Sequence, residues 1–277
     1  DCGVIRFTCT PRVQVGVFFV SKKNGRLRLI IDARRTNRLF RRPPHTRLGS
    51  VESFARLRVD PSSPEFFVAQ EDVKDFFYRL GIPRALGDWF ALPFCNIDAL
   101  RTAFDGSLPA DVSQMLSDGV QPFPSLAVLP MGFSWAFHWA HLSHSHLATL
   151  SLPQAAHVVD RRPAPKIRRE PCVALYADNA NHFGTDRNLT DKNRHTLNRT
   201  LHTHGLNTHE SVPACRLVTS LGVRINGLAG ACTAAPEREM RLEKGLDALL
   251  GGRLVNSADM GRVMGHITVR CLLCRPL

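Results

Sequence analysis

A buried apolar segment that ends in a carboxylate is the feature that most constrains this chain. Residues 66–70, FFVAQ, are apolar and extended in character, and they predict a buried strand that leads to Asp72. A carboxylate at the end of a buried strand is costly unless a cation lies against it. The DxxD spacing to Asp75 and the aromatic run at 76–78 also fit a strand that ends and a helix that begins, with Asp75 as a structural or capping residue.

A second carboxylate lies in a similar setting. Residues 172–184, CVALYADNANHFG, predict two short strands joined by a tight turn at Asp178 and Asn179. If the strands of Asp72 and Asp178 are neighbours in one sheet, the two acids lie side by side. Such a pair can hold two Mg²⁺ ions about 3.5–4 Å apart and support in-line phosphoryl transfer.

The basic charge of the chain is concentrated at its beginning. The formal net charge is +12, and the first fifty residues hold twelve Lys and Arg residues against Asp1 and Asp32. A polyanion such as a nucleic acid is the partner that this distribution favours. The alternative is a solvated basic face without a specific ligand.

Two apolar runs near the start predict a basic β-hairpin. Residues 15–20 and 27–32 flank SKKNGR, in which Asn24-Gly25 is typical of a tight hairpin turn. Basic side chains on such a hairpin can hold a triphosphate, Arg through forked contacts and Lys as a point charge. These side chains are Lys22, Lys23, Arg26 and Arg28. In the loop-like segment that follows, the arginines expected to contact a nucleic-acid backbone are Arg34, Arg35, Arg38, Arg41 and Arg42.

The remaining sequence predicts strands followed by helices. Residues 87–94, GDWFALPF, are expected to form a strand, and residues 95–122 to be irregular. Gly132 is expected to let the backbone pass close to a ligand, at the start of a long helix from Phe133 onward. The other expected elements are a basic linker at 160–170, a helix over 186–204, sheet-closing strands within 205–210 and 216–226, and two helices from Pro236.

Neither the histidines nor the cysteines predict a metal centre. Four histidines on one predicted helix have no interleaved acid or cysteine, which favours neutral side chains over zinc ligands. They are His138, His141, His144 and His146. The eight cysteines are scattered and are expected to be reduced thiols. No apolar run reaches about 18 residues, so we expect no membrane-spanning helix. The first residues do not resemble a secretion signal, so we expect a piece of a longer intracellular protein, from the cytoplasm or nucleus, that is not secreted.

Several motifs, in order, resemble those of reverse transcriptases of the retroelement kind. They are KKNGRLRLIIDARRTN, DVKDFF, LPMGF, LYADN, GLNTHE, SLGVRI and GHITVRCLLCRPL, and they extend over nearly the whole chain. Each motif alone is weak, but the series in one order is specific. The resemblance implies an α+β right-hand polymerase fold with an antiparallel palm sheet, a basic fingers hairpin and the start of a helical thumb.

The same resemblance implies a division of the chain into three parts. The fingers would span 1–65, the palm 66–235 and the partial helical thumb 236–277. Within the palm, a further fingers segment is expected at about 84–125 and a basic linker at about 151–170. RNase H or integrase domains are expected beyond this chain.

Carried over to the matching positions, the resemblance implies a role for each site residue. Asp72 and Asp178 would bind the metal ions, with the Val73 carbonyl as a further ligand. Mg²⁺ is the expected metal, and Mn²⁺ is the alternative. Phe77 would block the sugar 2′-OH, so that the substrate is a deoxynucleotide. The residues implied to contact the triphosphate, the nucleotide and the template are Lys22, Lys23, Arg28, Met131 and Gly132.

Two positions depart from the family pattern. Asn179 stands where the family usually has a second acid, and Met131 replaces the commoner Gln. Asn179 keeps a carbonyl oxygen as a ligand but removes one negative charge from the catalytic motif, so weaker or altered metal use is expected. Met131 loses a hydrogen bond and can still pack on a base.

The leading hypothesis is therefore RNA-directed DNA polymerisation by a retrotransposon-type nucleotidyltransferase. Its partners would be an RNA template, a DNA primer or RNA/DNA duplex, and dNTPs. The alternative is a decayed copy that binds RNA/DNA but does not polymerise. An RNA-dependent RNA polymerase is the third hypothesis and is disfavoured by Phe77. The oligomeric state stays open at this stage.

Overall fold

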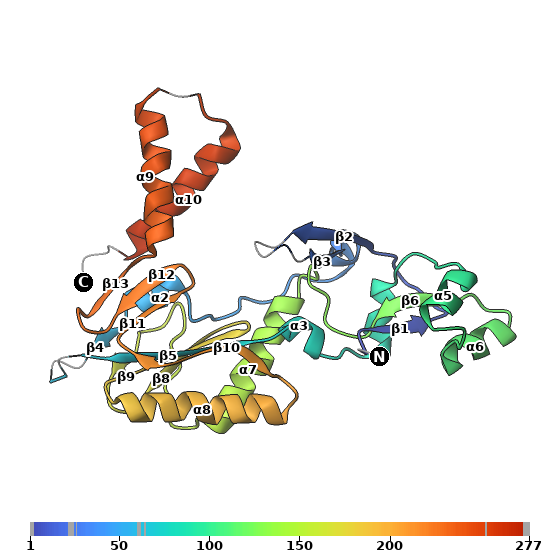
Figure 1. Cartoon of the computed structure of the whole chain (residues 1–277), viewed down its shortest axis with the longest axis horizontal. Helices are drawn as coiled ribbons and strands as arrows, with labels where there is room; N and C mark the ends of the chain where they lie inside the picture. Colours follow the sequence, from blue (N-terminus) through green and yellow to red (C-terminus); the bar gives the residue numbers. More distant parts are fainter. Residues whose placement is uncertain are drawn as a thin grey trace. The chain divides into compact units, whose positions relative to one another are not determined.

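The computed structural model describes residues 3–21, 25, 27–59, 62–63, 65–252 and 254–273, and for Arg28 the main chain only. The chain forms two compact units (Figure 1). The first comprises Asp1–His45 and Asp75–Leu142, and the second comprises Thr46–Lys74 and Ser143–Leu277. The fold is mixed α and β with small sheets, as the sequence predicts. The predicted divisions at 65 and 235 stay predictions.

The second unit is built on a four-stranded sheet with the order β10-β5-β9-β8. All three pairings in this sheet are antiparallel. The strands are β5 (Phe67–Val73), β8 (Cys172–Tyr176), β9 (Asn179–Gly184) and β10 (Thr208–Cys215). The sequence predicts β5 and β8 from their apolar runs, and β9 as the strand that follows the turn signal at Asp178 and Asn179. The central pair, β5 and β9, carries the two predicted acidic motifs.

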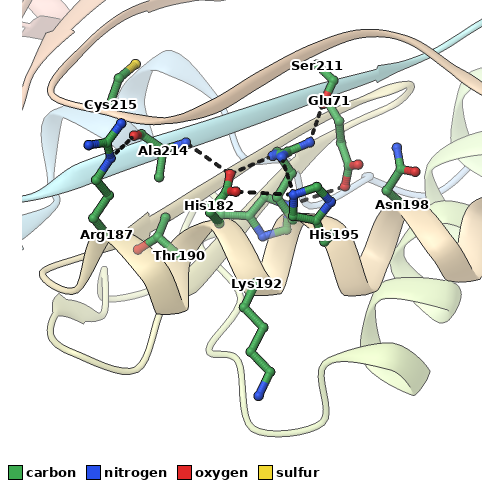
Figure 2. Close-up of polar contacts among 12 residues, drawn as sticks. Glu71, His182, Arg187, Thr190, Lys192, His195, Asn198, Ser211, Ala214 and Cys215 are labelled. Atoms are coloured by element: carbon green, nitrogen blue, oxygen red, sulfur yellow. Dashed lines mark hydrogen bonds and ion pairs between the residues drawn. The ribbon is translucent and has the colours of Figure 1, made fainter.

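Helix α8 (Arg187–Thr203) lies along one face of this sheet and contacts β5, β9 and β10. Its N-cap is Asp186, whose side chain accepts a hydrogen bond from the Leu189 N–H at 3.0 Å. Arg194 of α8 is buried, and its guanidinium binds Asp191 Oδ1 at 3.0 Å and the hydroxyl of Ser211 on β10. Figure 2 shows this polar contact region between the helix and the sheet. The contacts fix β10 against α8.

The opposite face of the sheet is covered at one end by an apolar core. Its buried members are Phe54, Phe66, Val68, Val158, Ile167, Cys172, Ala174, Phe183, Val218, Val223 and Ile225. Most of them come from the sheet, from α2 (Val51–Ala55), and from β11 (Leu217–Ser220) and β12 (Val223–Asn226). Strands β11 and β12 form a three-stranded sheet with β13 (Ala231–Ala234). The sequence predicts that the strands of 205–226 close one sheet, whereas β11 and β12 form a second sheet with β13. The sharp turn at Leu221-Gly222, with φ of 50° and 75°, connects β11 to β12 in this second sheet.

The end of the chain forms two helices, as its sequence predicts. Helix α9 spans Pro236–Leu250 and begins with Pro at its first position, and α10 spans Ser257–Leu273. The two helices contact each other, and α10 also contacts α2 and β13. A short parallel pair, β4 (Arg58–Val59) with β7 (Lys166–Ile167), completes the second unit.

The first unit contains the predicted hairpin and a set of short helices. The hairpin pairs β2 (Gly16–Ser21) with β3 (Leu27–Asp32), and a second pair joins β1 (Ile5–Thr8) to β6 (Phe123–Leu126). The helices are α1 (Arg34–Leu39), α3 (Phe76–Arg79), α4 (Arg84–Gly87), η1 (Asp88–Phe90), α5 (Ile97–Ala103), α6 (Ala110–Ser117) and the first half of α7 (Ala136–Ser151). Edge-to-face aromatic contacts join these parts, with the Phe133 ring 4.9 Å from Phe90 and 5.1 Å from Phe40.

Three secondary-structure predictions for this unit are wrong. The segment after the hairpin is not loop throughout, because Arg34–Leu39 form α1. Residues 87–90 form the end of α4 and η1 rather than a strand, and Ala91 makes isolated bridges to Gln14 and Ser125. Residues 95–122 are not irregular throughout, because Ile97–Ala103 form α5 and Ala110–Ser117 form α6. The polar residues that suggest a loop are helix caps: the Asn96 side chain accepts from the Asp98 N–H, and Pro109 precedes α6. Leu100 and Val112 supply the buried side of each helix.

None of the helices in the described part of the chain is both long enough and apolar enough to span a membrane.

Candidate active site

The sheet places the two predicted acids next to each other. Asp72 on β5 is paired with Asn179 on β9, and the Val73 N–H donates a hydrogen bond to the Asp178 carbonyl oxygen at 3.0 Å. Asp178 therefore stands one residue from the register partner of Asp72. The negative charge of Asp178 raises the pKa of Asp72, which places the two carboxylates in electrostatic contact. The strand adjacency on which the sequence-based hypothesis depends is present.

Alternation along β5 puts Asp72 on the same face of the sheet as Val68, which belongs to the apolar core. Glu71 points to the opposite face, where it is buried and its Oε1 lies 3.3 Å from Nε2 of the buried His182 (Figure 2). Gln70 is on the same face as Asp72, and its amide donates to Asn181 Oδ1 at 2.8 Å. Along this face the side chains change from apolar, through an amide pair, to carboxylates. The carboxylates lie where β5 ends.

The carboxyl group of Asp72 is held in an environment that disfavours its charge. Its side chain is 21% exposed, and its pKa is raised from 3.8 to about 6. Burial is the largest cause, and the nearby charge of Asp178 is the second. His209 has the opposite effect and lowers the pKa of Asp72, because its Nδ1 lies 3.5 Å from Asp72 Oδ1. A group of this kind is stabilised by any cation that binds between the two acids.

His209 and Glu210 on β10 complete the surroundings of Asp72. Glu210 is the register partner of Asp72 on that strand, and His209 Nε2 lies 3.7 Å from Glu210 Oε1. The GLNTHE motif predicts a strand here but gives His209 no role. Its contact with Asp72 depends on how β10 pairs with β5, including an irregular register between Thr208 and Glu210. A sequence does not carry that information.

The amide of Asn179 serves as a hydrogen-bond donor to the carboxylates. Its Nδ2 lies 3.2 Å from Asp178 Oδ1, and its contact with Asp72 lowers the pKa of that carboxyl. An aspartate at 179 would add a third negative charge at this point, whereas the amide donates to the two charges that remain. The catalytic role predicted for Asn179 stays a prediction, and its position is beside the acids.

The donor set suits a hard divalent cation that also takes ligands from a substrate. Two carboxylates and nearby main-chain carbonyls are oxygen ligands, and Mg²⁺ is often held by one or two carboxylates together with substrate phosphates and water. Among the described residues, no three His, Cys, Asp or Glu side chains converge to hold a metal ion. The basic side chain in contact with Asp72 is His209, which carries a charge only when it is protonated. Asp72 and Asp178 are therefore the side chains at this site that could contribute carboxylate oxygens to such an ion.

The residues predicted to bind the nucleotide lie in the first unit. Lys22 and Lys23 fall outside the described residues, and Arg28 lies on β3 with its main chain paired to Val20. Phe77 lies in α3, half-buried, with its ring 6.2 Å from that of Phe76. The roles assigned to these side chains stay predictions.

Gly132 makes a close backbone approach, but to the protein itself. Its φ is 119°, and a Cβ at this position would lie 2.3 Å from the Ile31 carbonyl oxygen on β3. The Met131 carbonyl accepts a hydrogen bond from the Ile31 N–H at 3.3 Å. Asn37 then holds the loop on its other side, donating to the Gly132 carbonyl at 2.9 Å and accepting from the Ser134 N–H at 2.8 Å. The sequence predicts that the Gly132 backbone passes close to a ligand, whereas the group nearest to it in the structure is the Ile31 carbonyl of the hairpin. The sequence analysis does not identify Asn37 as the residue that bridges this loop.

Comparison with solved structures shows which known fold this chain resembles. No protein-family model and no curated protein matches the sequence. Among solved structures, a foamy viral protease-reverse transcriptase dRH in complex with double-stranded DNA aligns with a TM-score of 0.65 and 13% identity over 96% of this chain. The fold of this chain is similar to that of a viral reverse transcriptase.

Two further structures support the reverse-transcriptase fold. The foamy viral protease-reverse transcriptase in complex with double-stranded DNA aligns with a TM-score of 0.63 and 14% identity. The same protein in complex with an RNA/DNA hybrid aligns with a TM-score of 0.57 and 14% identity. This chain covers 37%, 44% and 28% of the three compared chains, so it spans less than half of their length. At these identities the likeness shows the fold alone.

Proposed function

We propose that this chain is the polymerase region of an RNA-directed DNA polymerase, which transfers nucleotides from dNTPs to a DNA primer on an RNA template. The observation that carries the proposal is that Asp72, near the end of β5, lies beside Asp178, in the turn that leads into the adjacent antiparallel strand β9. The raised pKa of Asp72, caused first by burial and then by Asp178, supports a site built to receive cations. The reverse-transcriptase fold supports the reaction class by analogy.

In this proposal the four-stranded sheet is the palm, the hairpin β2–β3 belongs to the fingers, and α9 with α10 begins the thumb. Arginines of α1 and the segment after it are exposed, which suits contacts to a nucleic-acid backbone. They are Arg34, Arg35, Arg38, Arg41 and Arg42. Arg34 is engaged by Asp32 at 2.6 Å, which lowers the pKa of Asp32 to about 2. The compared structures contain double-stranded DNA and an RNA/DNA hybrid, and we extend that class of partner to this chain.

The reaction requires each acid to be ionised and correctly oriented. Asp72 and Asp178 would hold two Mg²⁺ ions, with the Val73 carbonyl as an additional ligand. When bound, such ions activate the primer 3′-OH and neutralise charge on the leaving pyrophosphate. Asn179 donates to the Asp178 carboxylate and keeps it oriented, and His209 contacts Asp72 from β10. Phe77 is proposed to exclude a 2′-OH and to select deoxynucleotides.

The test is primer extension by matched variants. Purified protein is given an RNA template, a DNA primer, dNTPs and Mg²⁺, and Asp72→Asn is compared with Asp75→Asn. Asp75 is exposed three residues away and has a left-handed φ of 51°, which asparagine tolerates. We expect extension by the wild type and Asp75→Asn and loss of at least about a thousandfold in Asp72→Asn. Equal extension by all three proteins would refute the proposal.

A second candidate function is favoured by one observation, the amide of Asn179 in place of a third acid. In that case the chain is a decayed copy that binds an RNA/DNA duplex but does not polymerise. The duplex would bind with the salt dependence of phosphate contacts, and no dNTP would be incorporated with Mg²⁺ or Mn²⁺. Incorporation that appears only after Asn179→Asp would decide for this candidate.

A further inference from the structure

The turn that carries Asp178 has an unusual backbone. Tyr176 and Asn179 are paired across β8 and β9, so Ala177 and Asp178 are the two central residues of a hairpin loop. Ala177 has a φ of 50°, whereas Asp178 is not among the residues with positive φ. A positive φ at the first central residue alone is the pattern of a type II′ turn, which favours glycine at that position. An alanine there is strained, and such strain persists only where neighbouring contacts hold it.

A buried histidine makes that contact. His144 lies in α7, is 0% exposed, and its Nδ1 is 2.7 Å from the Ala177 carbonyl oxygen. A carbonyl oxygen only accepts hydrogen bonds, so Nδ1 carries the proton and donates. Burial, the largest influence, lowers the pKa of His144, which keeps the imidazole neutral near pH 7. His144 and Ala177 belong to the same unit of the chain.

The atom that His144 binds controls the type of turn. Types I′ and II′ differ by a flip of the peptide that joins the two central residues, because type I′ needs a positive φ at both residues and type II′ only at the first. The Ala177 carbonyl belongs to that peptide. A flip would move the carbonyl away from His144 and change φ of Asp178, and so redirect its Cα–Cβ bond. On the other side of Asp178, its own carbonyl accepts from the Val73 N–H.

We propose that His144 is a positioning residue, whose hydrogen bond to the Ala177 carbonyl holds the turn in the type II′ form and so keeps the Asp178 carboxylate directed toward Asp72. Its consequence for catalysis rests on the polymerase function proposed above. Neither composition nor motif spacing assigns this role, since the sequence places His144 in a row of four histidines on one helix. A buried histidine that only fills space in the helix–sheet interface is the competing explanation.

The experiment asks whether a second substitution in the turn, Ala177→Gly, repairs the effect of removing the His144 hydrogen bond. His144→Leu removes the donor but keeps an apolar side chain, and His146→Leu is the control on an exposed position of the same helix. Ala177→Gly favours the type II′ turn without help from His144. Crystal structures of the variants report the orientation of the 177–178 peptide. Mn²⁺ affinity, measured by electron paramagnetic resonance, and the kcat and KM for dNTP report the consequence.

We expect the 177–178 peptide to be flipped or mixed in His144→Leu and restored in the double variant with Ala177→Gly. Mn²⁺ affinity and kcat should fall about tenfold in His144→Leu, with little change in the dNTP KM, and recover in the double variant. His144→Gln, which retains a donor, should resemble the wild type, and it replaces His144→Leu if that variant does not fold. An unchanged peptide in His144→Leu, or a defect that Ala177→Gly does not repair, would overturn the proposal. If the wild type binds Mn²⁺ but does not extend primers, the polymerase function fails while the peptide and Mn²⁺ measurements still decide the role of His144.

Discussion

Replacing Asp72 with asparagine should make the metal-free protein more stable although it removes the proposed activity. The pKa of Asp72 rises from 3.8 to about 6 in the folded chain, first because the carboxyl is buried and then because Asp178 lies nearby. Each pH unit of pKa change corresponds to about 1.4 kcal/mol, so ionising Asp72 costs about 3 kcal/mol more in the folded than in the unfolded chain. Asparagine keeps the shape of the side chain and avoids this cost.

The effect of pH follows from proton binding in the two states. Between about pH 4 and 6, folded Asp72 holds its proton whereas unfolded Asp72 has lost it. The contribution of this group to stability is therefore complete below about pH 4 and is lost as the pH rises to about 6. Relative to wild type, Asp72→Asn should gain about 3 kcal/mol in free energy of unfolding at pH 7.5 and almost nothing at about pH 4.

Urea denaturation in the presence of EDTA at the two pH values measures this difference. Asp75→Asn is the matched control and should change the stability by less than about 0.5 kcal/mol at either pH. Mg²⁺ should stabilise the wild type but not Asp72→Asn, because only the wild type retains both acids. If Asp72→Asn is no more stable than wild type at pH 7.5 in EDTA, the electrostatic account of the acid pair is wrong.

Three further variants test other parts of the account. Asn179→Asp should tighten Mn²⁺ binding, measured by electron paramagnetic resonance, and lower the metal-free stability, since it adds a third charge beside the acid pair; weaker Mn²⁺ binding would contradict this. Phe77→Val should reduce the preference for dNTP over rNTP by about 10–100-fold in single-nucleotide incorporation, and an unchanged ratio would remove Phe77 from substrate selection. Arg194→Met should lower the free energy of unfolding, measured by urea denaturation, by about 3 kcal/mol, because it removes the buried guanidinium that binds Asp191. The control, Arg199→Met at an exposed position of the same helix, should lower it by less than about 0.5 kcal/mol.

The sequence predicts best where a local pattern and a turn signal agree. The strand before Asp72 follows an apolar run, and the hairpin is predicted from the turn signal at Asp178 and Asn179. The structure contains both, with the turn one residue earlier, at Ala177 and Asp178. The helix after Asp186 is predicted because a good N-cap precedes a polar-faced periodic segment. In the region 95–122, the residues that cap the helices are also common in loops. Helices α5 and α6 are too short for their buried apolar residues to give a clear helical repeat in the sequence.

The candidate site is predictable in its acids and not in its supporting contacts. Asp72 and Asp178 follow from motif and strand patterns, and their adjacency requires only that two strands pair. His209 reaches Asp72 through an irregular register, and His144 reaches the Ala177 carbonyl from a distant helix. Such contacts depend on tertiary packing, for which a single sequence has no periodic signal.

The most direct test of the central claim is the number of divalent ions that the acid pair binds. Mn²⁺ is titrated into the wild type and into Asp178→Asn with an RNA/DNA primer–template and dNTP present, and bound ions are counted by electron paramagnetic resonance. The account predicts two ions in the wild type and at least one fewer in the variant. The same number of ions, with the same affinity, in both proteins would contradict it.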